Sequence, residues 1–222
     1  MKQPLRPGSL VVSCQAHADN PLQGAGFMRA MALAAVQGGA GGIRAEGVAD
    51  IAAIRAAVAV PLIGLLKRWD ARYAVYITPG FADAAAIVAA GCDVVALDAT
   101  SGTRDGEAPG LLIPRIRAEL GVAVMADIAT LEEGLAAAAM GADYVGTTLA
   151  GYTPARAATT GPDLELLREL VARCPVPVVA EGRFETPAQV AQAFALGARA
   201  VVVGTAITNP REITRRFAAA AP

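Results

Sequence analysis

Apolar residues along this chain fall into short, nearly unbroken runs that alternate with Ala-rich stretches of helical character. Three segments repeat one pattern, in which an Ala-rich stretch ends in a glycine, two residues follow and a β-branched run begins: "AAGCDVVALD", "AMGADYVGTT" and "ALGARAVVVG". A looser copy is "QGGAGGIRAEG". The pattern glycines are Gly39, Gly91, Gly141 and Gly197, separated by 52, 50 and 56 residues. The chain therefore contains four repeats of about fifty residues.

A second set of apolar runs lies between these segments, namely "VAVPLIGLLK", "LGVAVMADI" and "CPVPVVAEG", and "SLVVSCQ" precedes them all. Each repeat thus contains two strand–helix units. The runs are continuous rather than alternating, which is typical of parallel strands buried on both faces. The glycine after each Ala-rich stretch suits the left-handed conformation that commonly ends a helix.

Four repeats give eight strand–helix units without a linker or a change in composition. This favours a closed (β/α)8 TIM barrel, and we expect residues 1–222 to form a single domain of that kind. A doubly wound open sheet is the alternative. It is disfavoured because its usual GxGxxG signature is absent after the first strand, where "SCQAHADNPL" stands instead.

The composition narrows the classes of protein to consider. A chain of 222 residues can bury a large core, and 55% hydrophobic residues exclude intrinsic disorder. The formal net charge is -1 without blocks of like charge, so nothing indicates binding to nucleic acid or to a membrane surface. The N-terminal "MKQPLRPGSL" lacks the apolar region of a signal peptide. We therefore expect a soluble cytoplasmic protein whose cysteines, Cys14, Cys92 and Cys174, are buried reduced thiols.

Polar residues follow the apolar runs one after another. The stretch "VPVVAEGR" ends in Glu181 and Arg183, although a buried strand has no use for an unpaired carboxylate. The residues at the expected strand ends are Gln15, Arg44, Lys67, Asp98, Asp127, Thr147 with Thr148, Glu181, and Gly204 with Thr205. Active sites of (β/α)8 barrels lie at the C-terminal ends of the strands. We expect these side chains to converge on one cleft.

Lys67 and Glu181 are the candidate catalytic residues. An exposed lysine has a pKa of about 10.4 and is too basic to accept a proton at neutral pH. Burial and the nearby cations Arg44 and Arg68 would lower this pKa, while burial would raise the pKa of Glu181. Two such groups on opposite faces of one carbon can remove a proton and return it with inversion. The same lysine could instead form a Schiff base, as in aldolases, and the residues alone do not separate the two chemistries.

The last two strands predict a phosphate site. "EGR" (181–183) and "VGTAI" (203–207) place backbone N–H groups and the start of a short helix where barrel enzymes commonly hold phosphate. Glycine allows close approach of the backbone, and Arg183 adds a cation. The candidate phosphate-binding residues are Gly182, Arg183, Gly204 and Thr205. No metal site is expected, because the single histidine, His17, lies in a polar loop without a partner cluster.

Ten segments occur in order between about Ser13 and Phe217: "SCQA", "GGAGGIRAEG", "PLIGLLKR", "YITP", "ALDAT", "MADIAT", "TTLAGYT", "VPVVAEGR", "TPAQV" and "VVVGTAIT". As a set they resemble the N-acylglucosamine-6-phosphate 2-epimerases, the NanE-type N-acetylmannosamine-6-phosphate 2-epimerases. The resemblance implies a (β/α)8 isomerase of sialic acid catabolism that converts N-acetylmannosamine 6-phosphate into N-acetylglucosamine 6-phosphate without a metal or redox cofactor. The proton at C2 is acidic only beside an open-chain aldehyde at C1, so the sugar ring must open first.

The resemblance also implies roles for individual residues. Lys67 would be the base at C2 and Glu181 its acid/base partner. The sugar would be held by Gln15, Arg44, Asp127 and Tyr152, and the phosphate loops would contain Gly182, Arg183, Gly204 and Thr205. The resemblance further suggests a homodimer, to which the C-terminal "ITRRFAAAAP" is a candidate contributor.

The chain departs from the family pattern at the phosphate site. Where the family usually has arginine after "AIT", this chain has Asn209, which removes one charge-assisted contact. Arg211 is a candidate replacement. The loops "HADNPLQGAGF" and "SGTRDGEAPG" also differ. A phosphosugar-binding barrel without turnover is therefore an alternative to the epimerase, beside the Schiff-base aldolase or lyase.

Overall fold

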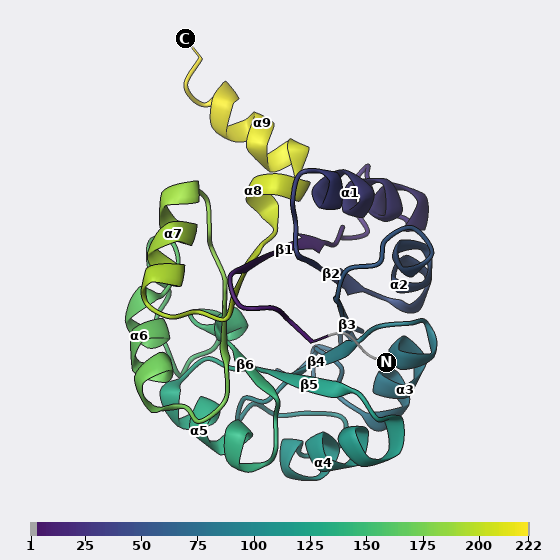
Figure 1. Ribbon diagram of the computed structural model, residues 1–222, viewed down its shortest axis with the longest axis vertical. Helices are drawn as coiled ribbons and strands as arrows, with labels where there is room; N and C mark the ends of the chain where they lie inside the picture. The colour runs from purple at the N-terminus through teal and green to yellow at the C-terminus, as the bar shows by residue number, and fades with distance from the viewer. Residues whose placement is uncertain (1–3, 222) are drawn as a thin grey trace.

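The computed structural model describes residues 4–221, which form a closed barrel of eight parallel strands surrounded by helices (Figure 1). The strands are β1 (Ser9–Cys14), β2 (Gly42–Glu46), β3 (Leu62–Leu65), β4 (Val94–Asp98), β5 (Ala123–Asp127), β6 (Tyr144–Gly146), β7 (Val178–Glu181) and β8 (Ala200–Val203). They follow one another around the barrel, and β1 closes it by pairing with β8, Val12 opposite Val203. The (β/α)8 prediction is confirmed. The open-sheet alternative is wrong, because an open sheet has two edge strands, whereas every strand here has a neighbour on both sides.

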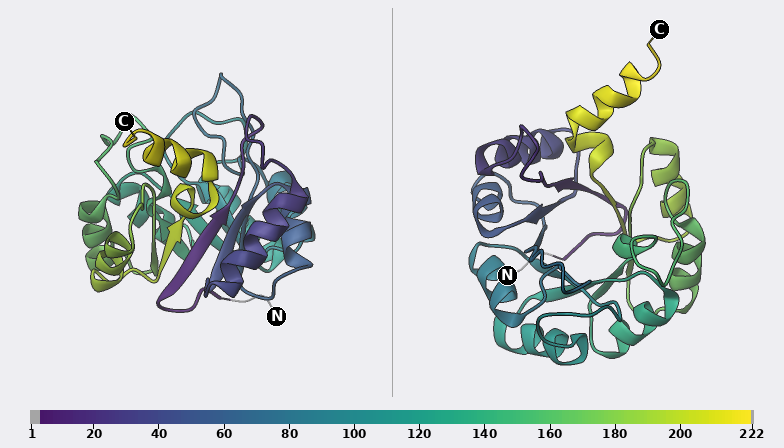
Figure 2. Two further views of the ribbon diagram at one scale, coloured as in Figure 1. Left: turned by 90° about the horizontal axis from the view of Figure 1, so that it is seen from above. Right: turned by 180° about the vertical axis from the view of Figure 1, so that it is seen from behind.

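Helices cover the outside of the barrel (Figures 1 and 2). They are α1 (Ala25–Gln37), α2 (Val48–Arg55), α3 (Phe81–Ala89), α4 (Pro109–Leu120), α5 (Leu131–Ala139), α6 (Leu164–Arg173) and α7 (Pro187–Ala195), and a 3-10 turn, η1 (Thr147–Leu149), follows β6. After β8 the chain forms the single-turn α8 (Thr205–Thr208) and then α9 (Pro210–Ala218), which projects away from the barrel. None of the helices in residues 4–221 has the length and the apolar run needed to cross a bilayer.

The four repeated glycines each end a helix. Gly39, Gly91, Gly141 and Gly197 follow α1, α3, α5 and α7 and have φ angles of 100°, 108°, 95° and 100°. Side chains with a Cβ rarely adopt such positive φ angles, whereas glycine does so at little cost. The repeat seen in the sequence is therefore a repeated helix stop, placed just before every second strand.

Side chains along each strand alternate between the barrel interior and the helix layer. The interior cluster contains Val11, Ile63, Leu65, Val94, Ala96, Met125, Val179, Ala200 and Val202, whereas their strand neighbours, such as Val12, Leu62, Val95, Val124 and Val201, pack under the helices. Tyr144 belongs to the interior cluster, and its hydroxyl accepts a hydrogen bond from the Leu5 backbone N–H at 3.2 Å. Counting on in steps of two from the interior residues leads to Gln15, Lys67, Asp98, Asp127, Thr148, Glu181 and Gly204. Alternation thus directs these strand-end residues inward.

The three cysteines are free thiols. Cys14 and Cys92 are buried, and Cys174 is half-buried. Burial raises the pKa of the Cys14 thiol to about 12, so this thiol stays protonated at neutral pH. The expected burial holds for Cys14 and Cys92, whereas Cys174 is less enclosed than predicted.

A substitution at Gly64 tests how tightly β3 packs against the helix layer. A Cβ added at Gly64 would lie 2.7 Å from Cys92 Cβ and 3.0 Å from Ile51 Cδ1. We expect Gly64→Ala to lower the free energy of unfolding by ~1–3 kcal/mol, because overpacking displaces neighbouring side chains. Gly26→Ala is the control, since Gly26 is exposed in α1 and a Cβ there meets no atom within 4 Å. Equal urea midpoints for the two variants would contradict the prediction.

Candidate active site

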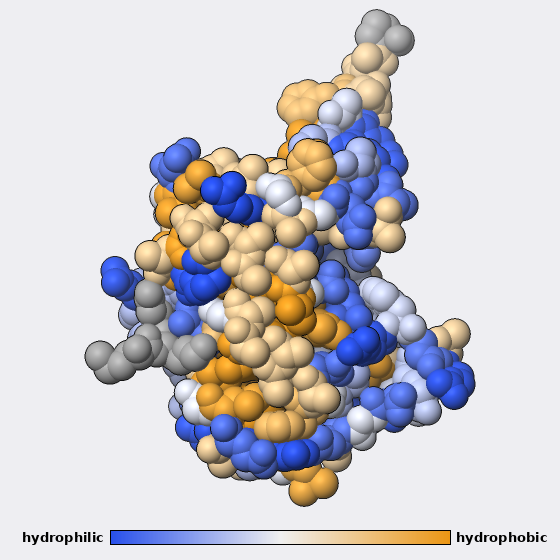
Figure 3. All heavy atoms as spheres, turned by 90° about the vertical axis from the view of Figure 1, so that its right-hand side faces the viewer, coloured by the Kyte–Doolittle hydropathy of each residue, from blue (hydrophilic) through white to orange (hydrophobic). Residues whose placement is uncertain are grey.

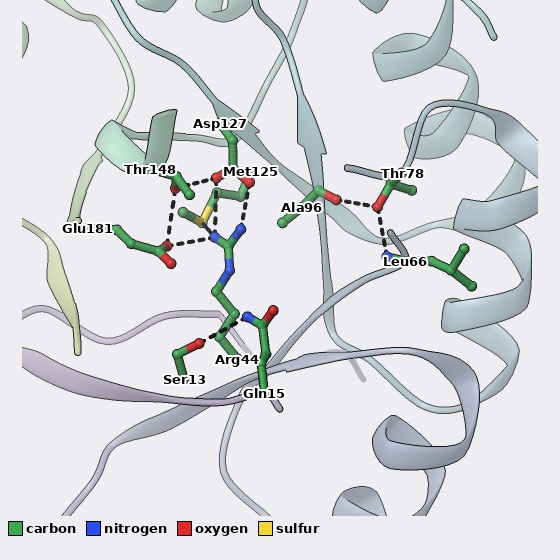
Figure 4. A network of polar contacts seen from close by, with 10 residues as sticks. All are labelled: Ser13, Gln15, Arg44, Leu66, Thr78, Ala96, Met125, Asp127, Thr148 and Glu181. Atoms are coloured by element: carbon green, nitrogen blue, oxygen red, sulfur yellow. Dashed lines mark hydrogen bonds and ion pairs between the residues drawn. The ribbon is translucent and has the colours of Figure 1, made fainter. Parts of the chain in front are cut away.

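Arg44 lies inside the barrel beneath the strand ends, with only 1% of its side chain exposed (Figure 4). Its Nη1 and Nη2 donate to Oδ1 and Oδ2 of Asp127 at 3.1 and 2.6 Å, and Nη1 also donates to Oε2 of Glu181 at 2.7 Å. The Thr148 hydroxyl lies 2.6 Å from Asp127 Oδ1 and 3.1 Å from Glu181 Oε2. One cation therefore holds two carboxyl groups, from β5 and β7, side by side.

This network moves the pKa values of its members in opposite directions. Burial alone would lower the pKa of Arg44, but the carboxylates of Asp127 and Glu181 outweigh it and hold that pKa above its ordinary value. Burial raises the pKa of Glu181 to about 7, with Arg44 opposing the shift and Asp127 adding to it. Glu181 is therefore available at neutral pH both as a carboxylic acid and as a carboxylate, which suits a general acid/base.

Lys67 follows β3 in a loop that folds back on the strand. Lys67 pairs with Ile77 across an antiparallel bridge, and Thr78 N–H donates to Leu66 O at 2.7 Å. The buried Thr78 hydroxyl donates to Ala96 O at 2.7 Å and accepts from Leu66 N–H at 3.1 Å (Figure 4). Thr78 has a φ angle of 43°, which is uncommon for a β-branched residue and costs backbone energy. These contacts fix the backbone that carries the lysine.

Burial lowers the pKa of Lys67 below its ordinary value. The charge of Arg44 lowers it further, while the carboxylate of Glu46 opposes the shift. Glu46 Oε1 also accepts from the Lys67 backbone N–H at 3.4 Å. Arg68 was also expected to lower the pKa of Lys67. It instead forms an ion pair with Asp83 at 2.8 Å, and 63% of its side chain is exposed. The predicted direction of the shift is confirmed, and Arg44 rather than Arg68 is the contributing cation.

A cavity of about 380 Å³ opens at the C-terminal ends of the strands. Lys67 and Glu181 both line it. The other predicted site residues in its wall are Gln15, Tyr152, Gly182, Arg183, Gly204 and Thr205. Arg44 and Asp127 are fully buried below Glu181 and do not belong to the wall. The size suits a small organic ligand enclosed on several sides.

Several wall residues were not singled out from the sequence. They include Ser13, Tyr76, Thr208, Glu185 and Arg216, and the exposed loop residue His17 also reaches the wall. Ser13 points into the barrel by the alternation of β1, and its hydroxyl oxygen accepts a 2.9 Å hydrogen bond from Gln15 Nε2 (Figure 4). Tyr76 stacks on Trp69 with ring centroids 4.0 Å apart. Only Ser13 could have been found from strand alternation.

Backbone geometry shapes the wall near Gly182. Gly182 and Arg183 have φ angles of 111° and 56°, so two consecutive residues are left-handed. Arg183 Nε and Nη1 donate to Gly161 O and Ala150 O at 2.9 and 2.8 Å, and Nη2 donates to Thr159 Oγ1 at 3.1 Å. Arg183 therefore holds the loop after β6 in place by hydrogen bonds, and it also lines the cavity.

Asn209 stands where the family pattern predicts an arginine, and it has a structural role. Asn209 Oδ1 accepts from Glu212 N–H at 3.4 Å and so caps α9. Arg211 binds Asp19 at 3.1 Å and does not belong to the cavity wall, so the predicted replacement by Arg211 is not supported by its position. In residues 4–221 no group of three or more His, Cys, Asp or Glu side chains is arranged to hold a metal ion.

Comparison with known proteins identifies close relatives. A family model described as "Putative N-acetylmannosamine-6-phosphate epimerase" (NanE) matches residues 28–221. Relatives named "Putative N-acetylmannosamine-6-phosphate 2-epimerase" include one from Thermosynechococcus vestitus, 53% identical over 202 residues (91% of this chain, 88% of the relative), and one from Cutibacterium acnes, 48% identical over 213 residues (95% and 92%). The solved N-acetylmannosamine-6-phosphate 2-epimerase from Clostridium perfringens matches with a TM-score of 0.94 and 44% identity, covering 98% of this chain and 95% of that one.

The raised pKa of Glu181 predicts a pH-dependent stability. Between its ordinary value of 4.5 and about 7, the folded chain binds a proton at Glu181 that the unfolded chain releases. This contribution to the free energy of unfolding therefore falls as the pH rises through that interval. We expect the stability of Glu181→Gln relative to the native chain to increase from pH ~4.5 to ~7, by a few kcal/mol, and to stay level above. Urea unfolding at a series of pH values measures this, and a constant difference would contradict it.

Proposed function

Since the chain belongs to the N-acetylmannosamine-6-phosphate epimerase (NanE) family, we propose that Lys67 and Glu181 exchange the proton at C2 of its substrate. The enzyme is an isomerase that interconverts N-acetylmannosamine 6-phosphate and N-acetylglucosamine 6-phosphate. The observation that carries the proposal is that the amine and the carboxyl group line one cavity, with pKa values shifted toward neutrality from opposite sides.

In the proposed reaction the sugar binds in its open-chain form, with C2 between the two groups. The neutral Lys67 amine removes the C2 proton from one face and leaves an enolate, whose charge is shared between C2 and the aldehyde oxygen at C1. C2 then receives a proton from Glu181 on the other face. Each turnover leaves Lys67 protonated and Glu181 ionised, so both must exchange protons with water before the next turnover in the same direction. The lowered pKa of Lys67 and the raised pKa of Glu181 both favour that exchange at neutral pH.

The remaining predicted residues divide between direct and indirect roles. Gln15 and Tyr152, in the cavity wall, are proposed to contact the sugar. Arg44 and Asp127 are proposed to act from below by holding Glu181, since neither belongs to the wall. The phosphate is proposed to bind at the part of the wall formed by Gly182, Arg183, Gly204 and Thr205. The first backbone N–H groups of α8, which begins at Thr205, have no partner within the helix.

We propose that the enzyme is a homodimer assembled through α9. No residue of α9 is buried, and Ile213 and Phe217, one turn apart, lie on one side of the helix, with 76% of Phe217 exposed. Figure 3 shows α9 standing clear of the barrel above a broad apolar band on the face of α1–α3, and Phe27 on α1 is 52% exposed. A second copy would cover these side chains.

The three free cysteines agree with action in the reducing cytoplasm, within sialic acid catabolism.

The proton-transfer proposal predicts solvent exchange at C2. Proton NMR of N-acetylmannosamine 6-phosphate with the enzyme in D2O should show formation of N-acetylglucosamine 6-phosphate with deuterium at C2. We expect Lys67→Met and Glu181→Gln each to lower kcat by ~10²–10⁴, as for loss of a general acid or base. Arg68→Met, in the exposed neighbour of Lys67, is the control and should retain activity.

Retention of the C2 hydrogen through turnover would exclude proton abstraction. The Schiff-base alternative is tested in the same preparation with borohydride. The sequence contains two lysines, Lys2 and Lys67, so an adduct trapped on Lys67 is identified by mass without ambiguity. Such an adduct would overturn the acid/base role of the lysine.

The dimer proposal predicts a mass of twice the 22.5 kDa of one chain by light scattering. Phe217→Asp should give the single-chain mass, because a carboxylate cannot be buried at the apolar contact without a partner. Leu111→Asp is the matched control, since Leu111 is 68% exposed on α4, in another part of the barrel. A dimeric Phe217→Asp protein, or a monomeric native chain, would contradict the proposal.

A further inference from the structure

Two guanidinium groups line the cavity, and they differ in how their donors are used. The Nε, Nη1 and Nη2 atoms of Arg183 all donate to oxygens of the loop after β6, as described above. Arg216, on α9, donates through Nη2 to Glu185 Oε1 at 2.7 Å, and 46% of its side chain is exposed. Every nitrogen of the Arg183 guanidinium thus donates to a protein oxygen, whereas Arg216 forms a single hydrogen bond within residues 4–221 and nearly half of its side chain is exposed.

The partner of Arg216 is easily exchanged. Glu185 leaves 49% of its side chain exposed and also belongs to the cavity wall. Ion pairs between exposed side chains contribute little to stability, so breaking this pair costs little. A planar guanidinium can form two parallel hydrogen bonds with phosphate oxygens, as it can with a carboxylate, so phosphate is a competent replacement for Glu185.

The position of Arg216 beside the cavity is fixed by contacts at the start of α9. Thr208 Oγ1 donates to Ser13 O at 2.8 Å, which holds α8 against β1. Asn209 then caps α9, and its Oδ1 lies 3.5 Å from Asn20 Nδ2 in the loop after β1. The other two arginines of α9 point elsewhere, because Arg211 binds Asp19 and Arg215 binds Glu212 at 2.6 Å.

We propose that Arg216 is the side chain that selects a phosphate monoester in this enzyme, by leaving Glu185 and pairing with the phosphate when substrate binds. Glu185 is the competing anion in the free enzyme. A phosphate dianion displaces it from Arg216, whereas the uncharged hydroxyl of an unphosphorylated sugar does not. The inference builds on the proposed function, because it assigns a residue to the phosphate of the same substrate.

The test compares Arg216→Ala with Arg215→Ala, a neighbour on the same helix whose side chain is 69% exposed and lies outside the wall. We expect Arg216→Ala to raise the KM for N-acetylmannosamine 6-phosphate and the Kd for inorganic phosphate by ~10–100-fold with little change in kcat, as for loss of a charge-assisted hydrogen bond. Arg216→Lys should recover part of the loss. Glu185→Gln should tighten phosphate binding, because it removes the competitor. Arg215→Ala should match the native enzyme.

Equal KM and phosphate Kd for Arg216→Ala and Arg215→Ala would overturn the inference, provided that light scattering and thermal melting show both variants folded and in the same oligomeric state. The phosphate titration does not depend on turnover. A native chain that binds phosphate through Arg216 but catalyses no C2 exchange would support this inference and refute the proposed function. Full epimerase activity together with phosphate binding that is unchanged in Arg216→Ala would support the proposed function and refute this inference.

Discussion

The proposed active site depends on one buried cation, Arg44. Asp127 and Glu181 reach into the barrel interior, where an ionised carboxylate without a partner would be expelled or neutralised. Arg44 makes their ionisation possible, because its planar group of five N–H donors serves both carboxyl groups at once. Glu181 is thereby held in place before any substrate arrives. The arrangement depends on this cation, since the loss of Arg44 would leave two buried carboxyl groups without a compensating charge.

The same interior has opposite effects on two cations. Arg44 is surrounded by carboxylates and stays charged, which suits a residue that only holds others in position. Lys67 is buried with less compensation, and its pKa falls. An arginine could not take its place, because a guanidinium does not release its proton in proteins, whereas an amine does so readily once it is desolvated. The chain otherwise relies on arginine, and Lys67 is the only lysine in residues 4–221.

The sequence was sufficient for the barrel because glycines such as Gly91 mark helix ends and because the strands are continuously apolar. It also predicted that Lys67 and Glu181 line one cavity, because the C-terminal ends of the strands of such a barrel surround the active site. It could not predict how deep Arg44 lies, because that depends on where β2 ends: Arg44 stands two residues before the end of the strand and does not belong to the cavity wall. Nor could it predict Arg216, because this residue reaches the cavity through the tertiary contacts of α8 and α9 rather than through a repeating pattern.

Alternation along the strands also restricts how the length of the chain can vary. A single-residue deletion within β7, before Glu181, would turn every later side chain of that strand to the opposite face. The carboxyl group would then point into the helix layer, and the ion pair with Arg44 would be lost although no residue of the site had been replaced. Insertions and deletions are therefore expected to accumulate in the connecting loops, and the residue count of each strand is constrained as strictly as the chemistry at its end.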